Sequence, residues 1–228
     1  MTQSLSLDEA RSLLGKDVLG PEEVATAFGA FSATDGDVPV PYKRADLEAA
    51  RRAGEMLVLR IASNGDRTPI TVVHMIEKFP QAFDAKLLRQ AGYQLKSDWG
   101  IELEPLAQEE TCLTGWALVR KEVLKETCNL AYEEQSACLA QYASSLGVPA
   151  QNVRRRTAVE ATYDTVLAFA ARGERLLEKT WDWTSSETVD RGYLNVGGFG
   201  PKGMQVLSFS TAVRHGALGI CPTRAALG

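Results

Sequence analysis

The chain has 228 residues, of which 45% are hydrophobic and 24% charged, and its formal net charge is −4. This composition is typical of a folded globular protein and excludes disorder over most of the length. The acidic balance disfavours duplex nucleic acid as the main partner, because neutralising phosphates requires a basic surface. No apolar run could span a bilayer and the first residues form no secretory signal, so the sequence predicts a cytoplasmic protein, or one carried in a virion.

Two short helices are predicted within residues 1–30. Ser6 and Glu9 form a capping box, which predicts a helix that ends at Gly15. Proline in the first turn of Gly20-Pro21-Glu22-Glu23 predicts a second helix after a tight turn. Since this helix begins with acids rather than with cations or hydrogen-bond donors, a packing helical hairpin is favoured over a DNA-reading helix-turn-helix.

The main domain is predicted over residues 42–228, after a linker or exposed loop at residues 31–41. The linker holds prolines and an Asp-Gly-Asp segment, a composition typical of turns and loops. The elements predicted next are a helix over 43–53 with a Glu48–Arg52 pair, a strand over 55–62, helices over 72–79 and 85–91, irregular chain or a short strand over 99–106, and a strand over 114–120.

Two long helices are predicted in the following part of the chain. The first spans 127–146 and would place Cys128 and Cys138 on one apolar stripe as buried free thiols. The second starts at the capping box formed by Thr157 and Glu160 and ends near Gly173. The four cysteines form no Cys-x-x-Cys pair, so no metal site is predicted.

The last part, residues 180–228, is predicted to be rich in strands. Helices first and strands last indicate an α+β fold. Gly198 to Gly203 fits the dinucleotide pattern G-x-G-x-x-G, but a strand rather than a helix follows, so a hairpin turn is predicted and no cofactor. Trp181 and Trp183 alternate and should face one side of the sheet, either as core or as a stacking platform.

No catalytic set is evident. Glu160 and Asp164 share a helix face, where a solvated surface is the simpler interpretation of paired carboxylates. The chain has only two histidines, and nothing near His215 suggests a general base held by a second group. Arg154-Arg155-Arg156 is interpreted as a solvated linker with one arginine folded back onto Glu160, or as a contact for an anionic partner.

A family resemblance rests on Trp183-Thr184-Ser185-Ser186, the strands 192–199 and 204–209, and Leu218-Gly219-Ile220 with Arg224. These motifs resemble the closing half of C-type-lectin-like domains in the broad bacterial and phage sense, of the Lcl C-terminal type. The resemblance implies an antiparallel sheet that carries a ligand surface on its loops. The whole chain is also similar to bacterial proteins that begin with a comparable helix pair, a likeness that implies no function.

The sequence therefore predicts a binding or interaction module rather than an enzyme. Its ligand, a protein or a small molecule, would contact Trp183, Arg191, Arg214 and His215 on the loops of the C-terminal sheet. One alternative is a hydrolase or transferase that uses a carboxylate with His215. A second alternative is a phage-linked structural or assembly protein, which would form a homo-oligomer.

Overall fold

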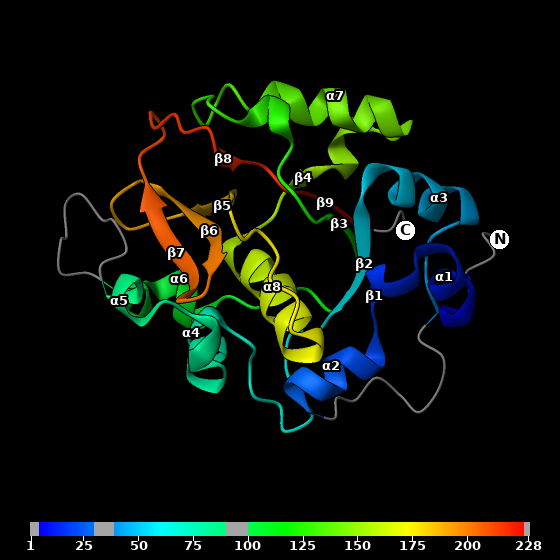
Figure 1. The fold of residues 1–228 in the computed structure, drawn as a ribbon, viewed down its shortest axis with the longest axis horizontal. Coiled ribbons are helices and arrows are strands. Elements are labelled where there is room, and N and C mark those ends of the chain that lie inside the picture. Colours follow the sequence, from blue (N-terminus) through cyan, green and yellow to red (C-terminus); the bar gives the residue numbers. More distant parts are fainter. Residues whose placement is uncertain (1–4, 30–38, 90–99, 226–228) are drawn as a thin grey trace.

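The structure is a computed structural model and describes residues 5–29, 39–89 and 100–225 (Figure 1). The predicted linker therefore lies mostly outside the described residues, as does the end of the helix predicted over 85–91. The α-helices are α1 (Leu7–Leu14), α2 (Pro21–Phe28), α3 (Arg44–Ala53), α4 (Val72–Lys78), α5 (Ala85–Leu88), α6 (Pro105–Glu109), α7 (Ser136–Leu146) and α8 (Ala158–Arg172). The 3-10 helices are η1 (Gly15–Asp17), η2 (Pro80–Ala82), η3 (Ile101–Leu103), η4 (Lys125–Thr127) and η5 (Ala150–Asn152). The strands are β1 (Val18–Leu19), β2 (Glu55–Arg60), β3 (Gly115–Arg120), β4 (Arg154–Arg155), β5 (Trp181–Glu187), β6 (Tyr193–Gly200), β7 (Gly203–Phe209), β8 (Leu218–Gly219) and β9 (Pro222–Ala225).

Both N-terminal helices form as predicted. The capping box of Ser6 and Glu9 is present, and Gly15 and Gly29 follow the last residues of α1 and α2. The connection between the helices is not the tight turn that the sequence predicts, because it contains η1 and the short strand β1. Since β1 pairs with β2 in parallel and α2 packs against α8, this segment belongs to the same packed body as the rest of the chain.

The first sheet has five strands in the order β1-β2-β3-β9-β4. The long pair β2 and β3 is antiparallel, with Leu57 opposite Leu118. Strand β9 lies between β3 and β4, so it pairs on both sides and occupies an interior position of the sheet. A buried ion pair holds it there, because Arg224 Nη2 lies 2.8 Å from Glu55 Oε2 of β2.

The second sheet has four strands in the order β7-β6-β5-β8. The glycine-rich segment is the predicted hairpin turn, since Pro201 and Lys202 connect the antiparallel strands β6 and β7. Gly198 has a φ of 57° and Gly203 a φ of 109°, backbone conformations that favour glycine. The two sheets together with the helices make the α+β fold that the sequence predicts.

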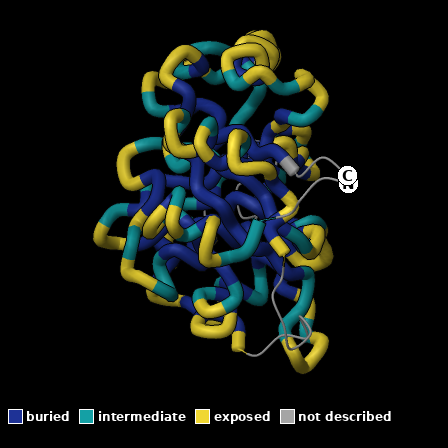
Figure 2. The backbone as a smooth tube through the Cα atoms, turned by 90° about the vertical axis from the view of Figure 1, so that its right-hand side faces the viewer, coloured by how far each residue is buried: buried dark blue, intermediate teal, exposed yellow. Residues whose placement is uncertain are grey.

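Helix α8 lies between the two sheets and contacts both of them (Figure 1). Every residue from Ala158 to Ala168 is buried, as expected for a helix enclosed on all sides. The capping box of Thr157 and Glu160 and the left-handed Gly173 bound this helix as predicted. Figure 2 shows buried backbone running through the centre of the molecule, with exposed segments around it.

Three predictions for the middle of the chain are wrong. Helix α7 begins at Ser136 rather than near residue 127, because Asn129 adopts a left-handed φ of 62° and the segment before α7 bonds to the loop at 211–215. Described residues 100–106 form η3 and the start of α6 instead of irregular chain or a short strand. On α3, Glu48 pairs with Arg44 rather than with Arg52.

Across the described parts of the chain, no helix combines the length and the apolar character that crossing a membrane requires.

Candidate functional site

Trp183, the first predicted ligand residue, is completely buried. Its ring packs edge-on against Tyr132, with 5.2 Å between the ring centroids, and Tyr132 in turn stacks on Tyr193. Arg155 lies over the Tyr132 ring, 4.0 Å from its centroid. Trp183 therefore belongs to a small aromatic core on one face of the second sheet, and a ligand could reach it only if this cover opened.

Trp181 lies on the same face of the sheet as Trp183, as predicted, but it is only partly buried. The indole rests on β6, since a Cβ added at Gly198 would lie 2.7–2.9 Å from three of its ring atoms. Its Nε1–H donates to Gln205 Oε1 at 3.3 Å, and its edge meets the ring of His215. The indole of Trp183 thus belongs to the core, and that of Trp181 lies at the border of the surface.

Arg214 and His215 lie on the exposed loop that leads from β7 to β8. Arg214 Nη1 forms an ion pair of 2.6 Å with Glu134, which fixes this loop to the segment before α7. His215 Nδ1 accepts a hydrogen bond from the backbone N–H of Ala217 at 3.2 Å. The structure therefore brings His215 next to Trp181 and leaves both loop residues accessible.

Arg191 lies in the hairpin that connects β5 to β6, with a left-handed φ of 62°. This hairpin follows the last residue of β5, whereas β8, which follows the loop of His215, pairs with the first residues of β5. The predicted ligand residues therefore belong to opposite ends of one strand.

The carboxylates of Glu160 and Asp164 are buried, and both accept hydrogen bonds from arginine side chains. Arg60 donates from Nε and Nη2 to the two oxygens of Asp164, at 2.9 Å and 2.6 Å, and from Nη1 to Glu160 at 2.7 Å. Arg154 binds both oxygens of Glu160, at 2.7 Å and 2.6 Å. The prediction that one arginine folds back onto Glu160 is confirmed. The prediction that Glu160 and Asp164 lie on a solvated helix face is wrong.

The same network continues inward through Arg156, which bridges Asp164 at 3.0 Å and Asp182 at 2.8 Å. The prediction of a solvated arginine run is therefore wrong for Arg155 and Arg156, both of which are buried. Burial acts to raise the pKa of Glu160, but the hydrogen bond from Arg154 and the charge of Arg60 bring it down to about 2. An ionised carboxylate that is held in this way is poorly suited to accept a proton in catalysis.

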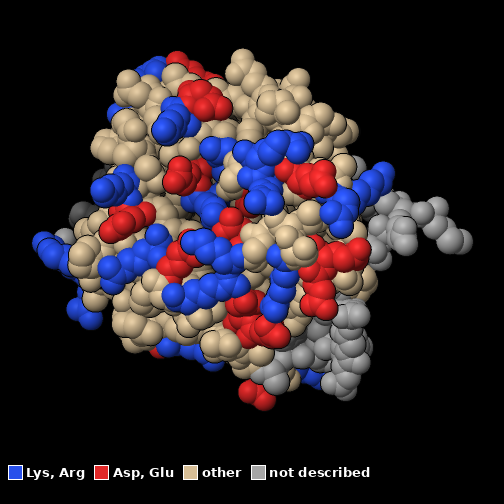
Figure 3. All heavy atoms as spheres, turned by 45° about the vertical axis from the view of Figure 1, so that its right-hand side comes forward, with Lys and Arg blue, Asp and Glu red and all other residues tan. Residues whose placement is uncertain are grey.

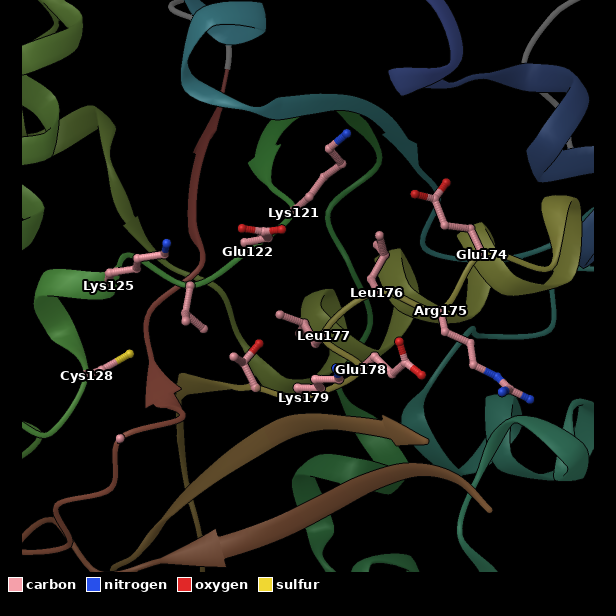
Figure 4. Close-up of a pocket in the computed structure, with 13 residues that line it drawn as sticks. Lys121, Glu122, Lys125, Cys128, Glu174, Arg175, Leu176, Leu177, Glu178 and Lys179 are labelled. Carbon is pink, nitrogen blue, oxygen red and sulfur yellow. The ribbon is translucent and has the colours of Figure 1, made fainter. Parts of the chain in front are cut away.

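A groove of about 780 Å³ lies beside the loop of His215 (Figure 4). Its walls come from the segment after β3, the segment between α8 and β5, and Gly216. The buried side chains of Val123, Leu176 and Leu177 form an apolar floor. The volume is within the range of pockets that bind small molecules or short peptides.

The rim of this groove carries charges of both signs. Glu122 and Lys125 lie on one segment, and Glu178 and Lys179 on the other (Figure 4). Within the described residues, none of these four side chains has an ion-pair or hydrogen-bond partner. Figure 3 shows a similar mixture of acidic and basic groups over the face that it presents. The rim charges are therefore available to a ligand that itself carries both signs.

Leu177 at the floor of the groove has a left-handed φ of 56°, which is unusual for a residue other than glycine. Its carbonyl accepts hydrogen bonds from the N–H groups of Thr180 and Phe199, at 3.4 Å and 3.2 Å. Backbone strain of this kind is common at ligand sites. No local sequence pattern predicts the groove, because its rim residues come from two distant segments and form no motif.

The four cysteines are free, and burial raises the pKa of Cys128, the cysteine that lines the groove. Among the described residues, no group of three or more histidine, cysteine, aspartate or glutamate side chains could hold a metal ion.

No family model matches the chain, and searches of curated proteins and of solved structures give no significant match.

Proposed function

We propose that the chain is a binding module without a reaction of its own, and that its ligand lies in the groove beside the His215 loop. The observation that carries this proposal is the combination of an apolar floor with rim charges that pair with no described residue. The resemblance to C-type-lectin-like domains supports a ligand surface on loops at this end of the sheet. Gly216, which lines the groove, follows His215 directly in the chain.

The hydrogen bonds that the buried carboxylates accept from arginines also support a binding function over a catalytic one. Glu160 accepts hydrogen bonds from Arg60, from Arg154 and from the N–H of Thr157. No hydrogen bond or ion pair in the described residues joins Glu160 or Asp164 to His215. A hydrolase that combines such a carboxylate with His215 is therefore less well supported than a ligand surface.

The ligand class that fits the groove is a short peptide with charges of both signs and one apolar side chain. Lys125 and Lys179 would bind carboxylates of the peptide, while Glu122 and Glu178 would bind its cations. Leu176 and Leu177 would contact the apolar side chain. Partly buried ion pairs would orient the peptide, and apolar burial would supply much of the affinity.

A displayed library of random short peptides tests this proposal. Peptides selected on the wild-type protein should bind much more weakly to the double variant Lys125→Glu, Lys179→Glu. The matched control is Lys202→Glu, which reverses an exposed lysine in the hairpin between β6 and β7. Selected peptides that bind all three proteins equally, or a library that yields no binder, would overturn the proposal.

A further inference from the structure

A second hollow, of about 300 Å³, shares no lining residue with the groove. Its walls include Arg60, Glu160 and Arg154, so the buried charge network reaches the surface of the molecule here. Leu113 also lines this hollow and is 84% exposed, which makes it one of the few large apolar side chains that the described surface presents to solvent.

Two guanidinium groups meet at a single oxygen on the wall of this hollow. Glu160 Oε1 lies 2.7 Å from Nη1 of Arg60 and 2.6 Å from Nη2 of Arg154. The side chain of Arg60 is only 3% exposed, whereas that of Arg154 is 47% exposed. Arg60 is therefore held inside the wall of the hollow, whereas Arg154 is held by Glu160 and is also accessible to solvent.

Both arginines keep hydrogen-bond donors that no described residue accepts. A guanidinium has five N–H groups. Arg60 directs three of them at Asp164 and Glu160, and Arg154 directs three at Glu160 and the carbonyl of Arg155. In the described residues each guanidinium thus retains two N–H groups without a partner. The Glu160 oxygens already accept from Arg60, Arg154 and Thr157, so the unused hydrogen-bonding groups of the Arg60–Glu160–Arg154 cluster are the N–H donors of its arginines.

We propose that this hollow binds the carboxylate of a small organic acid, with Arg60 and Arg154 as the donors. Glu160 and Asp164 balance Arg60 and Arg154 in charge, so the attraction for a carboxylate comes from the unused N–H groups of the two guanidinium groups rather than from a net charge. Paired N–H groups of arginine match the two oxygens of a carboxylate. The apolar part of the acid would lie against Leu113 and Trp116 at the side of the hollow.

A carboxylate fits better than a phosphate because of the acids already present. Asp164 lies directly behind Arg60, at 2.6 Å, and neutralises much of its charge. A phosphate dianion would add a second negative charge close to Glu160 and Asp164. The proposal concerns residues outside the groove, so its success or failure is separate from that of the peptide-binding function.

Titration of the protein with benzoate, acetate and inorganic phosphate tests this inference. The readout is the set of arginine Nε–H signals in ¹⁵N NMR spectra. Benzoate should give saturable shifts, and Arg154→Gln should weaken its binding at least about tenfold, as expected for the loss of a charge-assisted hydrogen bond. The matched control is Arg214→Gln, which removes an arginine of similar exposure that is also paired with a glutamate.

Two further variants test the roles of the planar guanidinium group and of the apolar contact separately. Arg154→Lys retains the charge but removes the planar pair of donors, and it should bind benzoate with intermediate affinity. Leu113→Ser should weaken benzoate while leaving acetate unchanged, and thermal unfolding of each variant reports whether it folds. Equal benzoate affinity in wild type and Arg154→Gln, the absence of saturable shifts in the wild type, or tighter binding of phosphate than of benzoate would overturn the proposal.

Discussion

The backbones of Gly203 and Phe83 approach so closely that a Cβ added to Gly203 would lie 2.3 Å from the carbonyl carbon of Phe83. Beside this contact, the N–H of Asp84 donates to the carbonyl of Met204 at 2.9 Å. The segment that caps α5 is therefore attached to β7 through backbone atoms. Only glycine leaves room for this attachment, and its φ of 109° is also one that other residues rarely adopt.

Gly203→Ala should lower the free energy of unfolding by at least about 2 kcal/mol, because it adds backbone strain and a clash with atoms that cannot move aside. Gly216→Ala is the control, since a Cβ there meets no atom within 4 Å. Urea denaturation of both variants measures the difference. Equal stability of the two variants would show that the backbones of Gly203 and Phe83 separate easily.

Glu160 should make the protein sensitive to acid. Its pKa of about 2 in the folded protein lies below its ordinary value of 4.5, so the stabilisation is complete above the ordinary value and is lost as the pH falls toward 2. Between pH 7 and pH 3 this one carboxylate should account for about 2 kcal/mol of lost stability. Wild type and Glu160→Gln, each unfolded by urea at both pH values, should differ in pH dependence by that amount.

Removal of the central carboxylate of the network should be more costly than removal of one at the surface. Asp164→Asn leaves Arg60 and Arg156 without adequate counter-charge in the interior, which should cost about 3 kcal/mol or more. Glu134→Gln, which breaks the exposed pair with Arg214, should leave the midpoint of thermal unfolding nearly unchanged. Similar losses in both variants would contradict the view that burial gives the network its importance.

Arg191 should respond to substitution through its backbone. Its left-handed φ of 62° costs little for glycine but is unfavourable for a β-branched residue. Arg191→Gly should therefore be as stable as the wild type or about 1 kcal/mol more stable, and Arg191→Val should be about 1 kcal/mol less stable. Differential scanning calorimetry of the two variants checks this order, and the reverse order would contradict it.

Local signals in the sequence predict much of the fold. The capping boxes of Ser6 and Thr157 and the glycines after the helices mark helix ends correctly, because these signals act within a few residues. The alternation of Trp181 and Trp183 likewise gives the correct shared face. Local signals predict the start of α7 too early, because Asn129 and its neighbours form hydrogen bonds with the distant loop that holds His215. The N–H of Asn129 donates to the carbonyl of His215 at 3.0 Å.

The sites depend on contacts that are distant in the sequence, which explains why they were harder to predict. Glu160 is recognisable as a capping residue, but nothing local indicates that Arg60, one hundred residues earlier, binds the same carboxylate. The groove likewise joins Lys125 to Lys179 through the packing of two separate segments. The charge pattern along a helix predicts ion pairs between side chains of that helix. It does not predict ion pairs with side chains from a strand, such as Arg60.

The position of β9 has a consequence for the order in which the protein is made. Ribosomes synthesise this strand after every other described element, yet it lies between β3 and β4 and supplies Arg224 to the buried Glu55. During translation the first sheet therefore exposes an open edge of β3, and Glu55 lacks the cation of Arg224, until β9 has emerged from the ribosome. We expect nascent chains of this protein to depend on chaperones at this stage, and chains that lack β9 to be removed by proteases.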